Sequence, residues 1–110
     1  MTRNKALEYI SRHDMLTELP NRKELDRRIK EYITAEDKEA VFMIFDLRKF
    51  KYINDTYGHE IWDSVLVFIA WVCKEVCKLY KGSLIARKWG DEFTGMFPGC
   101  TQKDSNGIAE

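Results

Sequence analysis

Apolar residues recur along this chain at helical spacing in two separate stretches. Within residues 21–34 they are Leu25, Ile29, Tyr32 and Ile33. A longer series, at steps of three or four residues, comprises Ile61, Val65, Phe68, Ile69, Val72, Val76 and Leu79. We expect the first stretch to form a helix that begins at the capping residue Asn21. The second predicts an amphipathic helix of about five turns whose buried face is formed by the residues of that series.

Three short apolar segments are typical of strands. The run Val41–Phe45 is continuously apolar, which is the pattern of a strand buried on both faces. The segments Leu84–Ala86 and Phe93–Phe97 flank a turn around Gly90-Asp91, so we expect an antiparallel hairpin. A buried central strand beside this hairpin, with helices on one side, indicates an α+β sandwich with a thin sheet of three strands.

Three further segments are predicted to be helical. Residues 1–14 form either the end of a helical stalk or a terminal helix that docks on the domain. Residues 47–59 form a short helix closed by Gly58, and Gly82 ends the long helix. Another helix is expected to open at residue 103.

Composition and charge exclude several classes of function. A chain of 110 residues makes one domain, and its 18 basic and 18 acidic residues balance. There is therefore no electrostatic case for nucleic acid or for an anionic membrane as a partner. No apolar run is long enough to span a bilayer and no signal peptide is visible, so we expect a cytoplasmic location. Cys73 and Cys77 are predicted to lie in the core, since three cysteines do not form a disulfide framework.

The candidate chemistry lies in three acidic side chains. Asp46 follows the predicted strand Val41–Phe45, and Asp91 and Glu92 lie on the hairpin turn. If the two strands are neighbours, these carboxylates meet at one edge of the sheet, where they can hold a divalent cation against a phosphate. The alternative is that they are ordinary turn residues, because acidic residues are common after strands.

Three separated motifs resemble those of the GGDEF domain of bacterial diguanylate cyclases. They are Asp14-x-Leu16-Thr17-x-Leu19-Pro20-Asn21-Arg22, Phe50-Lys51-x-Ile53-Asn54-Asp55-x-Tyr57-Gly58-His59 with Asp63 after it, and Ala86-Arg87-x-x-Gly90-Asp91-Glu92-Phe93. They follow the family's order over about residues 13–98. The resemblance implies a palm-like, ferredoxin- or nucleotidyl-cyclase-like central sheet flanked by helices and incomplete at the C-terminus. Residues 15–110 would be a partial GGDEF domain, and residues 1–14 its N-terminal linker helix.

The resemblance also implies an activity, in which a homodimer converts two GTP molecules to cyclic di-GMP and two pyrophosphates. The implied cofactor is Mg²⁺, with Mn²⁺ as the alternative. The implied metal ligands are Asp46, Asp91 and the backbone carbonyl of Leu47, and Glu92 would serve as a further ligand or as the base. An upstream sensor domain is an implied partner, through which the chain would be tethered to a membrane protein.

The remaining implied roles concern the nucleotide. By position in the family's motifs, Asn54 and Asp63 would read the guanine edge. Lys51 and the backbone after Leu47 would contact the terminal phosphates. Gly90 would let the hairpin backbone approach the nucleotide.

Several positions depart from the family's pattern. Trp89 replaces the leading glycine of the signature turn, where glycine-specific dihedral angles would be strained, and Trp62 replaces the glycine before Asp63. Arg48 and Lys49 bring positive charge next to Asp46. The product-inhibition arginine and aspartate of the family fall on Tyr80 and Ser83. The chain also ends before the family's last helices and strands, and we expect it to be a fragment of a longer protein.

These departures leave three hypotheses. The first is a diguanylate cyclase domain whose catalysis is impaired in this chain. The second is a catalytically inactive module that binds GTP or dimerises within cyclic di-GMP signalling. In the third, Trp62 and Trp89 pack together and close the nucleotide cleft, since each indole buries on the order of 150–250 Å².

Overall fold

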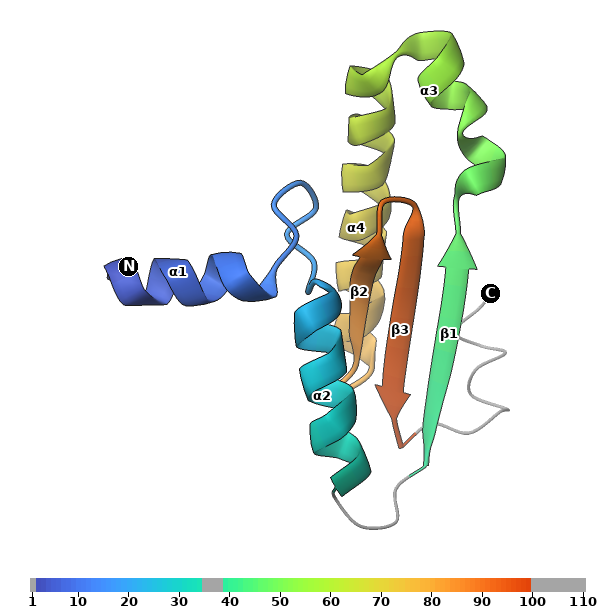
Figure 1. Ribbon diagram of the computed structural model, residues 1–110. Coiled ribbons are helices and arrows are strands. Elements are labelled where there is room, and N and C mark those ends of the chain that lie inside the picture. Colours follow the sequence, from blue (N-terminus) through green and yellow to red (C-terminus); the bar gives the residue numbers. More distant parts are fainter. Residues whose placement is uncertain (1, 35–38, 100–110) are drawn as a thin grey trace.

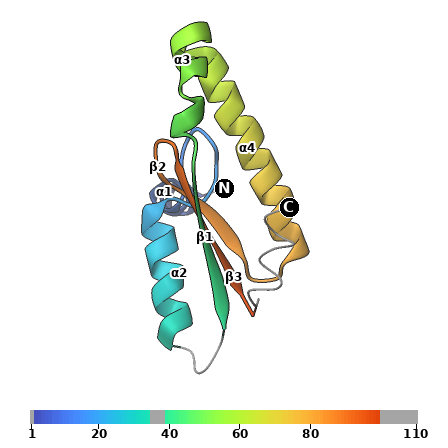
Figure 2. The ribbon, with the colours of Figure 1, turned by 90° about the vertical axis from the view of Figure 1, so that its right-hand side faces the viewer.

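The computed structural model describes residues 2–34 and 39–99, and it is a three-stranded sheet with a long helix on each face (Figures 1 and 2). The predicted helix at 103–110 and Cys100 lie outside the described residues. In chain order the elements are α1 (Arg3–Arg12), α2 (Arg22–Thr34), β1 (Ala40–Asp46), the 3-10 turn η1 (Arg48–Phe50), α3 (Tyr52–Tyr57), α4 (His59–Leu79), β2 (Leu84–Trp89) and β3 (Glu92–Pro98).

The sheet is antiparallel throughout, in the order β1-β3-β2, so the second arm of the hairpin is its central strand. The prediction that Val41–Phe45 is central and buried on both faces is therefore wrong. β1 lies at the edge, and its side chains alternate between partly buried and exposed. Phe42 and Ile44 are 49% and 68% exposed, because no described helix covers their side of β1.

The two long helices cover opposite faces of the sheet, which corrects the prediction of helices on one side (Figure 2). Alternation along the hairpin produces this arrangement, since successive side chains of a strand point to opposite faces. Leu84 and Ala86 pack with Leu25 of α2, whereas Ile85 and Phe93 pack under α4. The sheet flanked by helices that the family resemblance implied is confirmed.

Helix α4 occurs where the apolar spacing predicted it, but its buried face is rotated from the predicted one. The buried residues are Trp62, Leu66, Ala70 and Cys73. Two members of the predicted face, Phe68 and Leu79, are 63% and 78% exposed. Both sides of this helix carry apolar residues, and only contact with the sheet decides which side is buried.

Two local signals at helix ends are confirmed, whereas Gly82, predicted to end the long helix, lies beyond its C-cap Tyr80. The side chain of Asn21 accepts a hydrogen bond from the Glu24 backbone N–H at 3.0 Å and so caps α2. Gly58 takes a φ of 90° at the corner between α3 and α4, a conformation that favours glycine. The predicted burial of Cys73 is also confirmed. Burial and the nearby Cys77 raise the pKa of the Cys73 thiol to about 11, which leaves it protonated at neutral pH.

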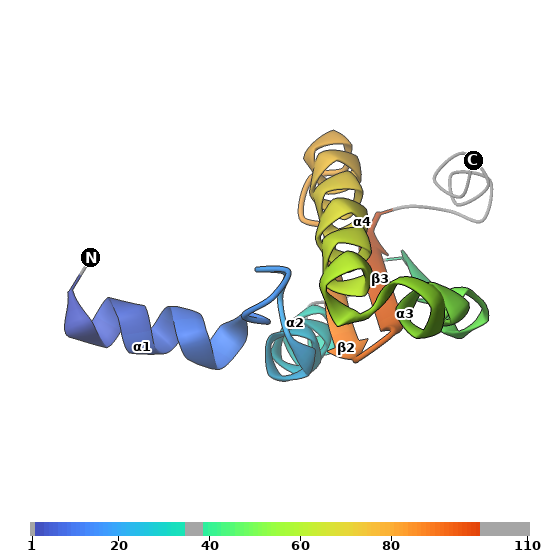
Figure 3. The same ribbon diagram turned by 90° about the horizontal axis from the view of Figure 1, so that it is seen from above.

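Helix α1 extends away from the body of the molecule (Figures 1 and 3) and buries none of its residues. Its apolar Leu7 and Ile10 are more than half exposed. Its role as a linker stays a prediction. No helix within the described ranges combines the length and the apolar character needed to cross a bilayer.

We predict that Phe93→Ala lowers the free energy of unfolding by about 3–5 kcal/mol, measured by urea denaturation. Phe93 is fully buried in the central strand, and its ring stacks on Phe45 at 5.1 Å between centroids. The matched control is Phe68→Ala on the exposed side of α4, expected to cost no more than about 1 kcal/mol. Equal losses at the two positions would contradict the placement of the core.

Candidate functional site

The end of β1 lies directly beside the hairpin turn. Asp46 is the ladder partner of Glu92, and the Leu47 backbone N–H donates to the Asp91 carbonyl oxygen at 2.9 Å. The predicted convergence of Asp46 with the acidic turn residues is therefore confirmed at the level of the backbone. It results from antiparallel pairing, which places the last residue of β1 opposite the first residue of β3.

A small pocket of about 230 Å³ opens at this end of the sheet. Four predicted site residues line it together: Lys51, Asp63, Gly90 and Asp91. They come from the segment before α3, from the first turns of α4 and from the hairpin turn. Trp62, Leu66 and Arg87 complete the wall. We call this space the acidic pocket after Asp63 and Asp91, whose charges Lys51 and Arg87 balance. Its volume suits a single planar base better than a whole nucleoside triphosphate.

The other predicted site residues lie outside the lining of the acidic pocket. Asn54 is half buried on α3, where its backbone carbonyl accepts the Gly58 N–H. Leu47 is 9% exposed and belongs to the core under α4. Four of the eight predicted site residues therefore line the acidic pocket. The two remaining acidic residues, Asp46 and Glu92, lie at the paired ends of β1 and β3.

Arg48 binds the carboxylate of Asp46. The Arg48 backbone N–H donates to one carboxylate oxygen at 2.7 Å, and its Nε lies 2.8 Å from the other. Within residues 2–34 and 39–99, no group of three or more His, Cys, Asp or Glu side chains is arranged to hold a metal ion. The donors present fit a cation that takes few ligands from the protein and the rest from phosphate oxygens and water, which is the usual way Mg²⁺ binds.

Arg87, for which the sequence predicted no role, binds the hairpin turn. Its Nε donates to the Gly90 carbonyl oxygen at 2.9 Å, and its Nη1 lies 3.0 Å from Oδ2 of Asp14. The Arg87 backbone N–H donates to the Pro20 carbonyl at 3.0 Å. The loop before α2 and the signature turn therefore form one hydrogen-bonded unit.

Asp14 also accepts hydrogen bonds within its own loop. The same Oδ2 accepts the Thr17 backbone N–H at 2.9 Å and the Thr17 hydroxyl at 2.8 Å. Glu18 takes a left-handed φ of 60°, which lets the loop turn back so that the Leu19 carbonyl accepts the Asp14 N–H. Burial acts to raise the pKa of the Asp14 carboxyl, but the hydrogen bonds from Thr17 and Arg87 outweigh it and lower this pKa below its usual value.

Trp89 points away from the acidic pocket, contrary to the expectation that it obstructs the nucleotide. Its indole lies on the α2 side of the hairpin, where the Arg22 guanidinium carbon sits 4.4 Å from the ring centroid. Its backbone has no positive φ, so the predicted strain at this position is also wrong.

The predicted packing of Trp62 against Trp89 is likewise wrong. Trp62 is 8% exposed in the core under α4, whereas Trp89 is 52% exposed, and the aromatic pairs of the described chain do not join them. Of the two indoles, only Trp62 borders the acidic pocket.

The positions of the family's inhibitory pair have structural roles here. Tyr80 packs edge-on against Phe97, with ring centroids 5.7 Å apart. The Ser83 hydroxyl hydrogen-bonds to the Tyr80 carbonyl oxygen at 2.6 Å. Neither residue offers a charge to a phosphate.

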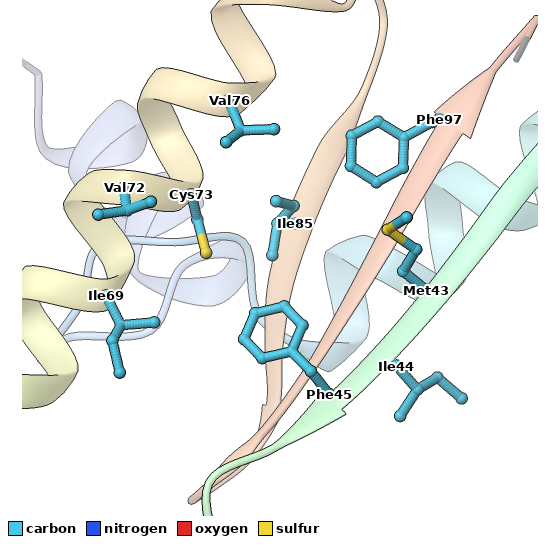
Figure 4. Close-up of a pocket in the computed structure, with 9 residues that line it drawn as sticks. All are labelled: Met43, Ile44, Phe45, Ile69, Val72, Cys73, Val76, Ile85 and Phe97. Carbon is cyan, nitrogen blue, oxygen red and sulfur yellow. The ribbon is translucent and has the colours of Figure 1, made fainter. Parts of the chain in front are cut away.

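A larger groove of about 530 Å³ lies between β1 and the second half of α4 (Figure 4). Its lining is apolar throughout: Met43, Ile44, Phe45, Ile69, Val72, Cys73, Val76, Ile85 and Phe97. It has no side chain that could bind a phosphate or a metal, because the Cys73 thiol stays protonated at neutral pH. The candidate site is therefore the acidic pocket and not this larger space.

Comparison with known proteins shows the family of this chain. A family model described as diguanylate cyclase, GGDEF domain, matches residues 11–110. The chain is 34% identical over 110 residues to the bifunctional diguanylate cyclase/cyclic di-GMP phosphodiesterase MucR of Pseudomonas aeruginosa, covering 97% of this chain and 16% of MucR. This α+β chain belongs to the GGDEF domain family.

Solved structures show the same fold. Diguanylate cyclase SiaD of Pseudomonas aeruginosa, in complex with its activator SiaC, superimposes with a TM-score of 0.81 at 34% identity, over 96% of this chain and 41% of SiaD. The GGDEF domain of DgcB from Caulobacter crescentus, in complex with c-di-GMP, gives 0.75 at 31% identity, over 89% of this chain and 58% of that domain. The chain thus spans less than two thirds of each of these relatives.

We predict that Asp14→Asn lowers the free energy of unfolding at pH 7 by about 1–3 kcal/mol, because the buried donors of Thr17 and Arg87 lose a charged acceptor. A carboxyl whose pKa is lowered in the folded state stabilises the fold above its unfolded pKa of about 4, and this contribution is lost as the pH falls through the folded value. The difference between wild type and Asp14→Asn should therefore shrink below about pH 4. The control is Asp26→Asn, whose carboxylate is exposed and 3.8 Å from Arg22. A pH-independent difference would contradict the proposed charge effect.

Proposed function

We propose that this chain carries the guanine-nucleotide site of a diguanylate cyclase, with GTP as the ligand and Mg²⁺ as its cation. The observation that carries the proposal is the convergence of Lys51, Asp63, Gly90 and Asp91 on one base-sized pocket. Residues 15–110 act in this proposal as part of a GGDEF domain, and α1 as the linker to an upstream sensor.

Each residue takes the role that its place supports. Asp63 meets the donors of the guanine edge from the acidic pocket, with Asn54 moving in from α3 on binding. Lys51 lines the same pocket, and its ammonium group would contact a phosphate of the bound nucleotide. A β-carbon at Gly90 would meet nothing within 4 Å, so this open backbone is available to the nucleotide.

Turnover requires two copies of the protein, because the 3′-hydroxyl of each GTP attacks the α-phosphorus of the other. Each attack releases a pyrophosphate, and two attacks close the cyclic dinucleotide. Glu92, opposite Asp46 in the ladder, is placed to accept the hydroxyl proton or to share the cation. Asp46, Asp91 and the Leu47 carbonyl would hold that cation, which supplies charge stabilisation at the phosphate when it is bound.

A second candidate function is a GTP-binding module without turnover. The specific observation in its favour is the Arg48 guanidinium on the Asp46 carboxylate, a cation already placed where Mg²⁺ would bind. Arg48 is 77% exposed, so it is free to leave if the metal binds more strongly. The two candidates share the nucleotide site and differ in whether the metal site fills.

We predict that Asp63→Asn weakens GTP binding by about tenfold or more, since a charged acceptor that bound guanine would cover is lost. Isothermal titration calorimetry with GTP and Mg²⁺ measures this effect. Asp26→Asn, a change of the same kind on α2, should leave the affinity unaltered. Wild-type protein that does not bind GTP would refute both candidate functions.

A further prediction separates the two candidates. Arg48→Ala should strengthen Mg²⁺-dependent GTP binding by up to about fivefold, because an exposed ion pair contributes up to about 1 kcal/mol. Lys49→Ala removes the same charge from the next position, and Lys49 forms no ion pair with Asp46 among the described residues, so this variant is the matched control. Equal effects of the two substitutions would show that Arg48 does not compete with the cation. Cyclic di-GMP formed by wild type or by Arg48→Ala, detected by chromatography, favours the cyclase, and GTP binding without product favours the binding module.

A further inference from the structure

A second cleft, of about 540 Å³, lies on the other side of the signature turn from the acidic pocket. Its wall includes four basic side chains, Arg22, Lys23, Arg87 and Lys88, and one carboxylate, Asp14. Its formal charge is therefore 4 − 1 = +3, in a chain whose net charge is zero. We call it the basic cleft. Positive charge predominates in this cleft, which favours an anionic ligand.

The basic side chains are not all engaged by the protein. Asp14 neutralises Arg87, which also binds the Gly90 carbonyl. Arg22 stacks on the Trp89 ring, and its one ion pair among the described residues is a long 3.8 Å contact with the exposed carboxylate of Asp26. Lys23 and Lys88 form no ion pair among the salt bridges of the described residues. Two ammonium groups and one guanidinium are thus available around a partly preorganised wall.

An aromatic surface lies within the same cleft. The indole of Trp89 is 52% exposed and already carries the flat Arg22 guanidinium at 4.4 Å. A planar base can stack on such a surface, and base–aromatic stacking tolerates any base because it uses no hydrogen-bonding edge. Cations for phosphates and an aromatic platform for a base therefore lie side by side.

From these observations we propose that the basic cleft binds a nucleotide, with its phosphates on Lys23 and Lys88 and its base against Trp89. The site is distinct from the acidic pocket, although Arg87 and Gly90 belong to the walls of both. Because the shared wall holds the signature turn, the two sites are coupled. Any effect of one ligand on the affinity for the other must be reciprocal.

The test uses ATP without divalent cation at low ionic strength, titrated into the 110-residue chain by calorimetry and by tryptophan fluorescence. The double variant Lys23→Ala/Lys88→Ala should weaken ATP binding by about a hundredfold, at about tenfold for each charged contact. The matched control Lys74→Ala/Lys81→Ala removes the same charge from other faces and should change the affinity less than about twofold.

Two further variants distinguish this site from the proposed GTP site. Asp63→Asn should leave ATP binding unaltered, and loss of ATP binding in that variant would place ATP in the acidic pocket and overturn the proposal. Trp89→Ala should remove the preference for ATP over inorganic tripolyphosphate. Absence of ATP binding to the wild type, equal weakening by the two lysine pairs, or equal affinity of wild type for tripolyphosphate and ATP would each overturn it. None of these results depends on whether GTP binds.

Discussion

The guanidinium group of Arg87 is the contact on which the arrangement of the site depends. It joins the Asp14 carboxylate of the N-terminal loop to the Gly90 carbonyl of the hairpin turn. Its side chain is only 15% exposed, so these charge-assisted hydrogen bonds are partly shielded from water. Removing Arg87 or Asp14 would leave the charge of the other half-buried and unpaired. This cost keeps the loop of Asp14, 73 residues away in the sequence, attached to the turn.

This attachment makes the hairpin turn a wall between two spaces of different charge. On the α4 side lie the carboxylates of Asp63 and Asp91, and on the α2 side lie Lys23 and Lys88. The acidic pocket is also lined by Lys51 and Arg87, so its formal charge is 2 − 2 = 0, whereas that of the basic cleft is +3. A balanced net charge therefore conceals a local excess of positive charge, which lies beside the signature turn.

Trp89 shows how a local rule can mislead. A bulky residue in place of a glycine predicted steric obstruction and backbone strain. In the structure the residue has an ordinary φ, and its ring leaves the acidic pocket to stack under Arg22. The register irregularity between Arg87 and Trp89 in the hairpin is where the side chain takes this direction. The substitution therefore adds a contact between α2 and the hairpin.

Much of the candidate site was predictable because its residues lie in motifs whose backbone is set locally. Asp63, Gly90 and Asp91 were named from the motifs, and the pocket contains them. The role of Arg87 was not predicted, although an arginine in one motif and an aspartate in another offered complementary charges. Their pairing joins positions 14 and 87. Local sequence patterns do not predict a contact between residues so far apart in the chain.

From the sequence alone follow the family, the helices at Asn21 and after Gly58, and the hairpin around Gly90. These depend on capping, spacing and turn chemistry, which act between near neighbours in the chain. The tertiary structure decided the edge position of β1, the buried face of α4 and the direction of Trp89. In each case a strand, a helix or a side chain could face either of two directions, and the neighbouring residues in the sequence do not favour one of them. Only contacts between distant segments give the two directions different energies.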